Sequence, residues 1–169
     1  MTNSPIKVRA ARTSDIDAIL AIRQPLEGSA VLLGHEKVSF YEAVPEFLVA
    51  VDESGAVVGA GALHVMWEDL AEVRSMVVAE EVRGSGVGTK VLEALVQKAR
   101  DLGIKRVFCL TFETGFFGKF GFEEISDVPV DEETFDQMVR SHDDGVAEFL
   151  DLARVKQNTL GNTRMLKTL

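Results

Sequence analysis

The residues of this sequence best suited to chemistry include three glycines within five positions, Gly84, Gly86 and Gly88, directly before an apolar pattern of helical spacing. Glycine takes positive φ without strain and lets the backbone approach a ligand closely, so several N–H groups can point at one anion. The positive end of the following helix adds to this preference for negative charge. Arg83 precedes the glycines and can pair with a phosphate. We therefore predict a phosphate-binding segment made of Arg83, Gly84, Ser85, Gly86, Val87, Gly88 and Thr89. An ordinary glycine-rich turn is the alternative.

Two common nucleotide-binding patterns do not fit this segment. A nucleotide P-loop closes with Gly-Lys-Ser/Thr, whereas Gly88 is followed by Thr89 and Lys90 in the reverse order. A dinucleotide fingerprint places its last two glycines three positions apart, whereas Gly86 and Gly88 are two apart. Neither a nucleoside triphosphate nor a dinucleotide is therefore the expected ligand.

The elements that position the glycine segment are strands and helices in alternation. A helix over Gly88–Leu102 is predicted by apolar residues at helical spacing, with Gly103 at its end. Alternating or fully apolar runs predict strands at Lys7–Arg9, Phe47–Val51, Val57–Met66, Ala71–Ala79, Arg106–Thr111 and Phe122–Ile125, with Thr163–Leu169 as an edge strand. Gly59 and Gly61 indicate a bulge or a close backbone approach in the third of these strands.

Further helices are predicted from caps and breakers. One begins at Thr13–Asp15 and is expected to stop near Pro25 and Gly28, where a mobile substrate loop would follow. The segment Ala30–Glu46 reads as a strand-like piece and then a helix. Short helices are predicted at Phe116–Phe122 and Asp131–Ser141. The order of elements predicts an α/β fold with a mixed sheet and helices on both faces.

Composition limits the classes of function. The 169 residues suit a single domain, 1–169, with ordinary hydrophobic (46%) and charged (27%) fractions. A net charge of -9 argues against nucleic acid or an acidic membrane as partner, because both require a basic surface. The first residues lack the apolar core of a signal peptide, and a lone Cys109 cannot form an internal disulfide, so a cytoplasmic protein is predicted.

The pattern Arg-x-x-Gly-x-Gly at Arg83, Gly86 and Gly88, after a strand and before a helix, resembles the pyrophosphate-binding motif of the GNAT family of acyl-CoA-dependent N-acetyltransferases. A second anchor, Phe116–Phe122, resembles the aromatic-x-x-x-Gly-Phe pattern that ends that fold. The resemblance covers Lys7–Ile125 and leaves 127–169 as a C-terminal extension. It implies the GNAT fold, acetyl-CoA as co-substrate and no metal.

The resemblance also implies roles for residues of the strand before the glycines. The backbone of Met76, Val77 and Val78 would bond the pantetheine arm as a pseudo-strand. Strand alternation places Glu72 and Arg74 on one face together with Met76 and Val78. Glu72 stands where many members of the family carry a glutamate base that deprotonates the amine. A solvated charge paired with Arg74 is the alternative for Glu72.

The general acid is less clearly indicated. The family often uses a tyrosine to protonate the CoA thiolate, and Phe117 occupies that position here, which leaves Phe117 as a cofactor contact. Thr111, at the end of the Arg106–Thr111 strand, is the nearest hydroxyl by topology, and water is the other proton source. Cys109 is interpreted as a core residue rather than a nucleophile, because nothing in the sequence stabilises its thiolate.

A narrower resemblance links Gln24–Gly28, Gly59–Leu63, Ala71–Glu72 and Phe108–Thr111 to the acetyltransferase domain of bacterial N-acetylglutamate synthases, in particular the stand-alone form. It implies acetyl transfer from acetyl-CoA to the α-amine of L-glutamate, the first step of arginine biosynthesis. These enzymes commonly carry an arginine at the position of Glu113, so glutamate and glutamine both stay open as acceptors.

The acceptor needs cations for its carboxylate. Arg74 is the first candidate, followed by Lys37 and Arg23. Two alternatives to an amino-acid N-acetyltransferase stay open. One is a GNAT enzyme of other specificity, acting on protein N-termini or polyamines, and the other is a non-catalytic acyl-CoA sensor. A homodimer is also left open.

Overall fold

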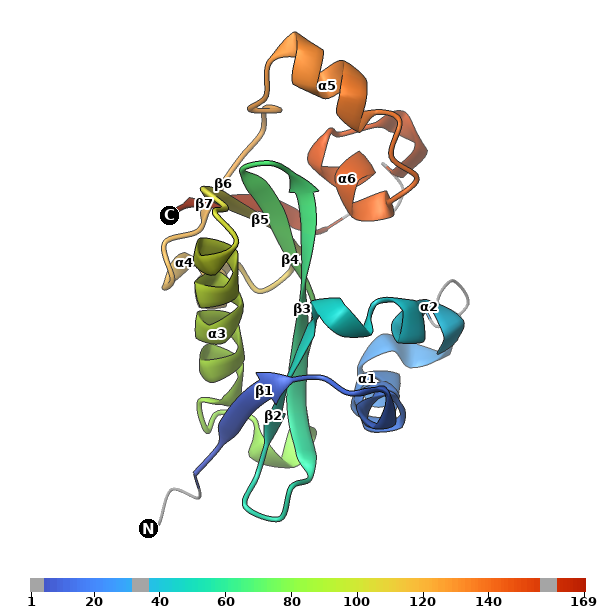
Figure 1. Cartoon of the computed structure of the whole chain (residues 1–169), viewed down its shortest axis with the longest axis vertical. Coiled ribbons are helices and arrows are strands. Elements are labelled where there is room, and N and C mark those ends of the chain that lie inside the picture. Colours follow the sequence, from blue (N-terminus) through green and yellow to red (C-terminus); the bar gives the residue numbers. More distant parts are fainter. Residues whose placement is uncertain (1–4, 32–36, 156–160) are drawn as a thin grey trace. The chain divides into compact units, whose positions relative to one another are not determined.

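The structure is a computed structural model that describes residues 5–31, 37–155 and 161–169, without the side chains of 25–31 (Figure 1). Seven strands of these residues form one sheet in the order β1-β2-β3-β4-β5-β7-β6. Their bounds are β1 Lys7–Ala10, β2 Phe47–Val51, β3 Val57–Trp67, β4 Leu70–Val78, β5 Arg106–Thr111, β6 Glu123–Glu124 and β7 Thr163–Thr168. The sheet is mixed, because β4 and β5 are parallel whereas β1–β2, β2–β3, β5–β7 and β6–β7 are antiparallel.

The helices are α1 Ile16–Val31, α2 Lys37–Glu42, α3 Val87–Asp101, α4 Thr114–Gly118, α5 Glu132–Met138 and α6 Asp144–Phe149. The chain divides into two compact units, Met1–Leu63 with Ser75–Lys98, and His64–Arg74 with Ala99–Leu169. The prediction of one domain over 1–169, with 127–169 as an extension, stays a prediction.

In the first unit, α1 and α2 cover one face of the sheet and α3 covers the other (Figure 1). Because side chains alternate along a strand, Ala60 and Ala62 pack with α1 and α2, whereas Gly59 and Gly61 lie under α3. A Cβ atom on Gly61 would lie 2.8 Å from Leu95 Cδ1. The predicted close backbone approach at these glycines is therefore confirmed, and it lets α3 pack directly on β3.

Helix α1 differs from the prediction, because it continues past Pro25 and Gly28 to Val31. The predicted stop, and the mobile substrate loop after it, are therefore wrong as far as Val31. Proline in a helix interior costs a hydrogen bond and a steric clash, but this penalty can be outweighed by packing elsewhere along the helix. Ile16 and Ile19 supply such packing, since both are almost fully buried. The predicted strand-like piece falls partly on residues 32–36, outside the described residues, and α2 confirms the helix that was expected after it.

In the second unit, β7 pairs with β5 over its whole length and with β6 on its other side. The prediction of an edge strand at Thr163–Leu169 is therefore wrong, since β7 is an inner strand. The two-residue β6 pairs outside it through Glu123 and Glu124. A strand of two residues is too short to show an alternating hydrophobic pattern, so the sequence does not reveal that β6 lies outside β7 in the sheet.

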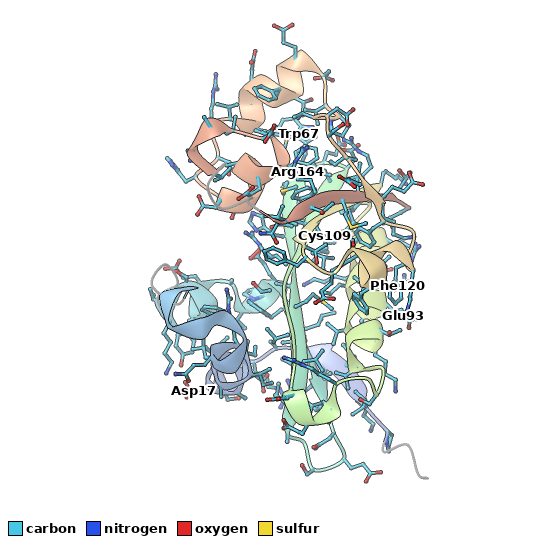
Figure 2. The ribbon with its side chains drawn as sticks, turned by 180° about the vertical axis from the view of Figure 1, so that it is seen from behind. Asp17, Trp67, Glu93, Cys109, Phe120 and Arg164 are labelled. Atoms are coloured by element: carbon cyan, nitrogen blue, oxygen red, sulfur yellow. The ribbon has the colours of Figure 1, made fainter. Side chains whose placement is uncertain are left out.

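Helices α5 and α6 share an apolar cluster with β4 and β5, made of Leu70, Phe108, Met138, Val146, Phe149 and Leu150. The rings of Phe108 and Phe149 meet edge to face at 5.3 Å. Arg164 of β7 donates from Nε to the Glu148 carbonyl at 3.1 Å and also to the Phe149 carbonyl (Figure 2). These bonds cap the last turn of α6, a helix that sequence analysis did not predict.

Strand β4 carries a break in its alternation. Ser75 has a φ of 57°, in the left-handed region that non-glycine residues rarely adopt. Such an irregularity re-aims the side chains that follow it. Glu72 and Arg74 share a face as expected, and the same face for Met76 and Val78 stays a prediction.

Candidate active site

Glu72 is the chemically most unusual residue of the second unit. It lies on β4 opposite Phe108 of the parallel strand β5, and only 4% of it is exposed. Its Oε1 atom has no hydrogen-bond partner among the described residues. The backbone of Gly145 lies against the carboxylate so closely that a Cβ atom there would overlap Oε1 and lie 2.9 Å from Oε2. A buried carboxylate with an unsatisfied oxygen is costly, and such groups are typical of functional sites.

Three charged or ionisable side chains surround this carboxylate in a chain of contacts. Nε of Arg74 lies 3.4 Å from Oε1 of Glu72, and Nη1 of Arg74 donates to Oδ1 of Asp143 at 2.8 Å. Nε2 of His64 lies 3.7 Å from the same Oδ1 atom. The geometry confirms that Glu72 and Arg74 share a face, as predicted, and it adds Asp143 and His64 to the group.

The environment raises the pKa of Glu72 from 4.5 to about 7. Burial is the main cause, because it disfavours the charged form, and the nearby charges of Asp143 and Glu148 act in the same direction. Arg74 and His64 oppose the shift but are outweighed by burial. A carboxylate with this pKa accepts a proton readily near neutral pH, which is what a general base must do.

The other predicted residues of the second unit are Thr111, Phe117 and Cys109, which lie on β5 and α4. Oγ1 of Thr111, at the end of β5, accepts the backbone N–H of Glu113 at 2.8 Å, so the hydroxyl proton can still be donated elsewhere. Phe117 on α4 is buried, and the centre of its ring lies 5.2 Å from the ring centres of both Phe116 and Phe122. Burial raises the pKa of Cys109, which Figure 2 labels on β5, so its thiol stays protonated as a core residue would. The acid role of Thr111 and the cofactor contact of Phe117 stay predictions.

Helix α4 begins and ends earlier in the sequence than the predicted helix. It spans Thr114–Gly118 rather than Phe116–Phe122, and the chain then turns through Gly121, whose φ is 87°. The backbone N–H of Phe122 donates to the Phe117 carbonyl at 3.2 Å, so a hydrogen bond joins the two ends of this turn.

The predicted phosphate-binding segment lies in the first unit, between β4 and α3. Gly84 and Gly86 have φ values of 80° and 90°, whereas Gly88 lies in the first turn of α3 and needs no positive φ. The side chain and the backbone N–H of Ser85 both bond the Val82 carbonyl, which fixes the turn. The first four N–H groups of a helix have no partner within it, so the start of α3 offers donors beside two glycines. Binding of a diphosphate by Arg83 to Thr89 stays a prediction.

The strand residues predicted to hold the pantetheine arm differ in burial. Val77 is buried in the cluster with α1 and α2, whereas Met76 and Val78 are partly exposed. A Cβ atom on Gly61 would lie 2.8 Å from Sδ of Met76. The roles of their backbones toward a cofactor stay predictions.

The cations proposed for the acceptor already have neighbours within their own units. Nζ of Lys37 pairs with Oδ1 of Asp17 at 2.6 Å, and the guanidinium of Arg23 lies 5.1 Å from the centre of the Phe40 ring. Burial lowers the pKa of Arg23. Arg74 lies next to Glu72 within the second unit. Substrate binding by each of these cations stays a prediction.

Four residues around Glu72 were not singled out in the sequence: His64, Asp143, Gly145 and Glu148. Asp143 caps α6 by accepting the Val146 N–H at 3.0 Å. A cap followed by apolar residues three, six and seven positions later, at Val146, Phe149 and Leu150, is a helix signal that could have been recognised. Gly145 concealed it, because glycine within the first turn argues against a helix.

The described part of the chain shows neither a candidate metal site nor a membrane-spanning helix. No group of His, Cys, Asp and Glu side chains there could hold a metal ion. Within 5–31, 37–155 and 161–169, no helix combines the length and the hydropathy needed to cross a membrane.

The known sequences that resemble this chain are acetyltransferases. The acetyltransferase (GNAT) family profile matches residues 17–122. An amino-acid acetyltransferase of Mycobacterium tuberculosis is 53% identical over 164 residues, which cover 96% of this chain and 94% of that protein. An amino-acid acetyltransferase of Neisseria meningitidis is 31% identical over 124 residues, and these cover 72% of this chain but 28% of that longer protein.

Solved structures agree with these sequences. Rv2747 from Mycobacterium tuberculosis, in complex with CoA and NLQ, superposes with a TM-score of 0.90 and 52% identity, covering 96% of this chain and 99% of that one. N-acetylglutamate synthase from Neisseria gonorrhoeae, complexed with coenzyme A and N-acetyl-glutamate, has a TM-score of 0.76 at 24% identity and shares the fold over 98% of this chain and 35% of its own. The predicted mixed-sheet acyltransferase fold is thereby confirmed, and this chain belongs to the acetyltransferase (GNAT) family.

Proposed function

We propose that this protein is an amino-acid N-acetyltransferase that transfers acetyl from acetyl-CoA to the α-amine of L-glutamate or L-glutamine. The relative at 53% identity bears the name amino-acid acetyltransferase and spans nearly the same length, which supports this acceptor class. The reaction would be the first step of arginine biosynthesis and would take place in the cytoplasm. A homodimer is part of the same proposal, and sedimentation of the purified protein tests it separately.

The observation that carries the proposal is the state of Glu72. An α-ammonium group must lose a proton before its nitrogen can attack a thioester. Glu72 combines burial, an oxygen that accepts no hydrogen bond from the described residues and a pKa of about 7, so it can take that proton near neutral pH. A carboxylate kept only as a structural ion pair would be expected to have a lowered pKa instead.

Arg74 gives the site its preference for an amino acid. Its guanidinium is adjacent to Glu72, so the α-carboxylate of a small substrate could be held while its amine faces the base. Arg83 to Thr89 would bind the diphosphate of acetyl-CoA, and the backbone of Met76, Val77 and Val78 would bind its pantetheine arm. Attack of the amine expels CoA thiolate, which takes a proton from Thr111 or from water. Lys37 and Arg23 are secondary candidates for contacts to the acceptor.

A thiol-release assay tests the proposal. Acetyl-CoA is offered with each of a panel of free amino acids, polyamines and peptides, and free CoA thiol is measured. We expect turnover with glutamate or glutamine and little with spermidine or peptides. Turnover with polyamines or peptide N-termini alone would assign another specificity, and acetyl-CoA binding without turnover on any acceptor would indicate a sensor.

A further inference from the structure

Asp143 precedes α6 and has every polar atom engaged. Its N–H bonds Oγ of Ser141 at 3.1 Å, and its carbonyl accepts from Arg154 at 3.3 Å. Oδ2 accepts the N–H of Val146 at 3.0 Å, and Oδ1 accepts Nη1 of Arg74 at 2.8 Å. A side chain fastened in this way is held rigidly, and such rigidity is what a supporting residue of a catalytic site requires.

The hydrogen bond from Arg74 to Oδ1 of Asp143 fixes the position of the guanidinium. Arg74 faces two carboxylates, Asp143 through Nη1 at 2.8 Å and Glu72 through Nε at 3.4 Å. The shorter, hydrogen-bonded contact is the one to Asp143. If Asp143 carried no charge, Arg74 could turn further toward Glu72, whose Oε1 accepts no hydrogen bond from the described residues. A direct bidentate pair there would hold Glu72 in its charged form and weaken it as a base.

We propose that Asp143 is the positioning residue of this acid–base site. Its carboxylate holds Arg74 and His64 beside Glu72, so that Arg74 can meet the acceptor carboxylate while Glu72 stays available for the proton of the amine. The proposal rests on the proposed function. It also places a residue beyond the family match of 17–122 within the working site.

The charged and titratable groups around Glu72 come from each element packed against it. Arg74 lies on β4 and His64 on β3, and both favour its charged form. Asp143 and Glu148, from the region of α6, disfavour that form, and Cys109 on the neighbouring strand β5 stays a neutral thiol. Removing the charge of Asp143 should therefore move the titration of Glu72 to lower pH, both directly and through the released Arg74.

The test compares Asp143→Asn and Asp143→Ser with wild type. Both residues cap helices well, so α6 keeps its cap. Asparagine that caps α6 through its oxygen turns an NH2 group toward Arg74, and serine is too short to reach it. We expect KM for the amino acid to rise at least about tenfold, the usual loss for a charge-assisted hydrogen bond, with KM for acetyl-CoA unchanged. The acid limb of the kcat profile should move to lower pH.

Asp131 provides a matched control. It caps α5 by accepting the Thr134 N–H at 2.7 Å and is exposed. Asp131→Asn and Asp131→Ser should leave both KM values and the pH profile as in wild type. Equal kinetic changes at Asp131 and Asp143 would reduce Asp143 to a helix cap and overturn the proposal.

Two further measurements keep the result decisive. In an Arg74→Lys background the effect of Asp143→Asn on amino-acid KM should largely vanish, because the two residues act as a unit, and additive effects would contradict this. Carbon-13 NMR of the Glu72 carboxyl, assigned through Glu72→Gln, follows its titration without any substrate. A lower midpoint in Asp143→Asn supports the proposal and an unchanged midpoint overturns it, whereas failure of the proposed function would appear as wild-type protein without turnover on amino acids.

Discussion

Gly145 at the start of α6 and Glu72 on β4 are in direct contact, although the two residues are far apart in the sequence. A Cβ atom at position 145 would overlap Oε1 of Glu72 and lie 2.9 Å from its Cδ. Both partners are buried. The absence of a side chain at Gly145 therefore determines how closely α6 covers the carboxylate.

The first prediction is that Gly145→Ala impairs both stability and catalysis. Overpacking of this kind costs roughly 1–3 kcal/mol in the free energy of unfolding, and the displaced Glu72 should lower kcat by about tenfold or more. Urea unfolding and steady-state kinetics measure the two effects. Gly118→Ala is the control, because a Cβ atom there meets nothing within 4 Å. Wild-type kcat in Gly145→Ala would show that α6 adjusts without disturbing the base.

The second prediction concerns Glu72 as the base. Glu72→Gln keeps the shape of the side chain but cannot accept a proton, so kcat should fall by roughly 10²-fold or more with little change in acetyl-CoA affinity. In wild type, kcat should rise with pH through a midpoint near 7, where Glu72 loses its proton. Calorimetry and pH-dependent kinetics check both statements. Normal turnover of the variant between pH 6 and 9 would leave Glu72 as a structural partner of Arg74.

The third prediction follows from the same pKa through its effect on stability. A native pKa of about 7 against 4.5 for an ordinary glutamate means that the native state binds more protons between these values, so the free energy of unfolding falls as pH rises through this window. Glu72→Gln removes this dependence. The variant should be more stable than wild type at pH 8 by about 1–3 kcal/mol, with the gap closing toward pH 5.

Urea titrations at pH 5, 6, 7 and 8 measure that gap. Glu124→Gln on the exposed strand β6 serves as the control and should follow wild type at every pH. A gap that stays constant with pH would mean that Glu72 is ionised throughout the range.

The fourth prediction concerns the acceptor clamp. Arg74→Lys keeps the charge but loses the planar fork that binds a carboxylate through two bonds, so KM for glutamate or glutamine should rise far more than KM for acetyl-CoA. Glutamate methylated on its α-carboxylate should be a poor substrate for wild type. Kinetics with both substrates varied decide the matter, with the exposed Arg100→Lys as control. An unchanged amino-acid KM would argue against the clamp.

The fifth prediction concerns the glycine segment. Gly86→Ala puts a side chain at a φ of 90°, and Gly55→Ala puts one at 84° in the turn between β2 and β3. Neither Cβ atom would meet another described residue within 4 Å, and the similar φ values give the two variants comparable backbone strain. Calorimetry should show a loss of acetyl-CoA affinity for Gly86→Ala alone. An equal affinity in both variants would remove the close backbone approach from the account.

The sequence by itself determined the features that depend on local pattern. The apolar spacing of α3 and the glycines before it predicted the helix and the turn that precedes it, because helix periodicity and positive φ are properties of neighbouring residues. Glu72 and Arg74 were placed on one face by strand alternation alone, and their contact at 3.4 Å confirms it. The positions of the strands up to β5 along the chain followed from the same local signals.

Only the tertiary structure decided what surrounds Glu72. Arg74 and Asp143 are 69 positions apart, and no spacing rule connects a strand residue to the cap of a helix that far along the chain. The pKa of Glu72 is raised chiefly by burial against the backbone of Gly145, and the charges of Asp143 and Glu148 add to the shift. The inner position of β7 and the continuation of α1 past Pro25 have the same origin, since in each case distant packing outweighs a local preference.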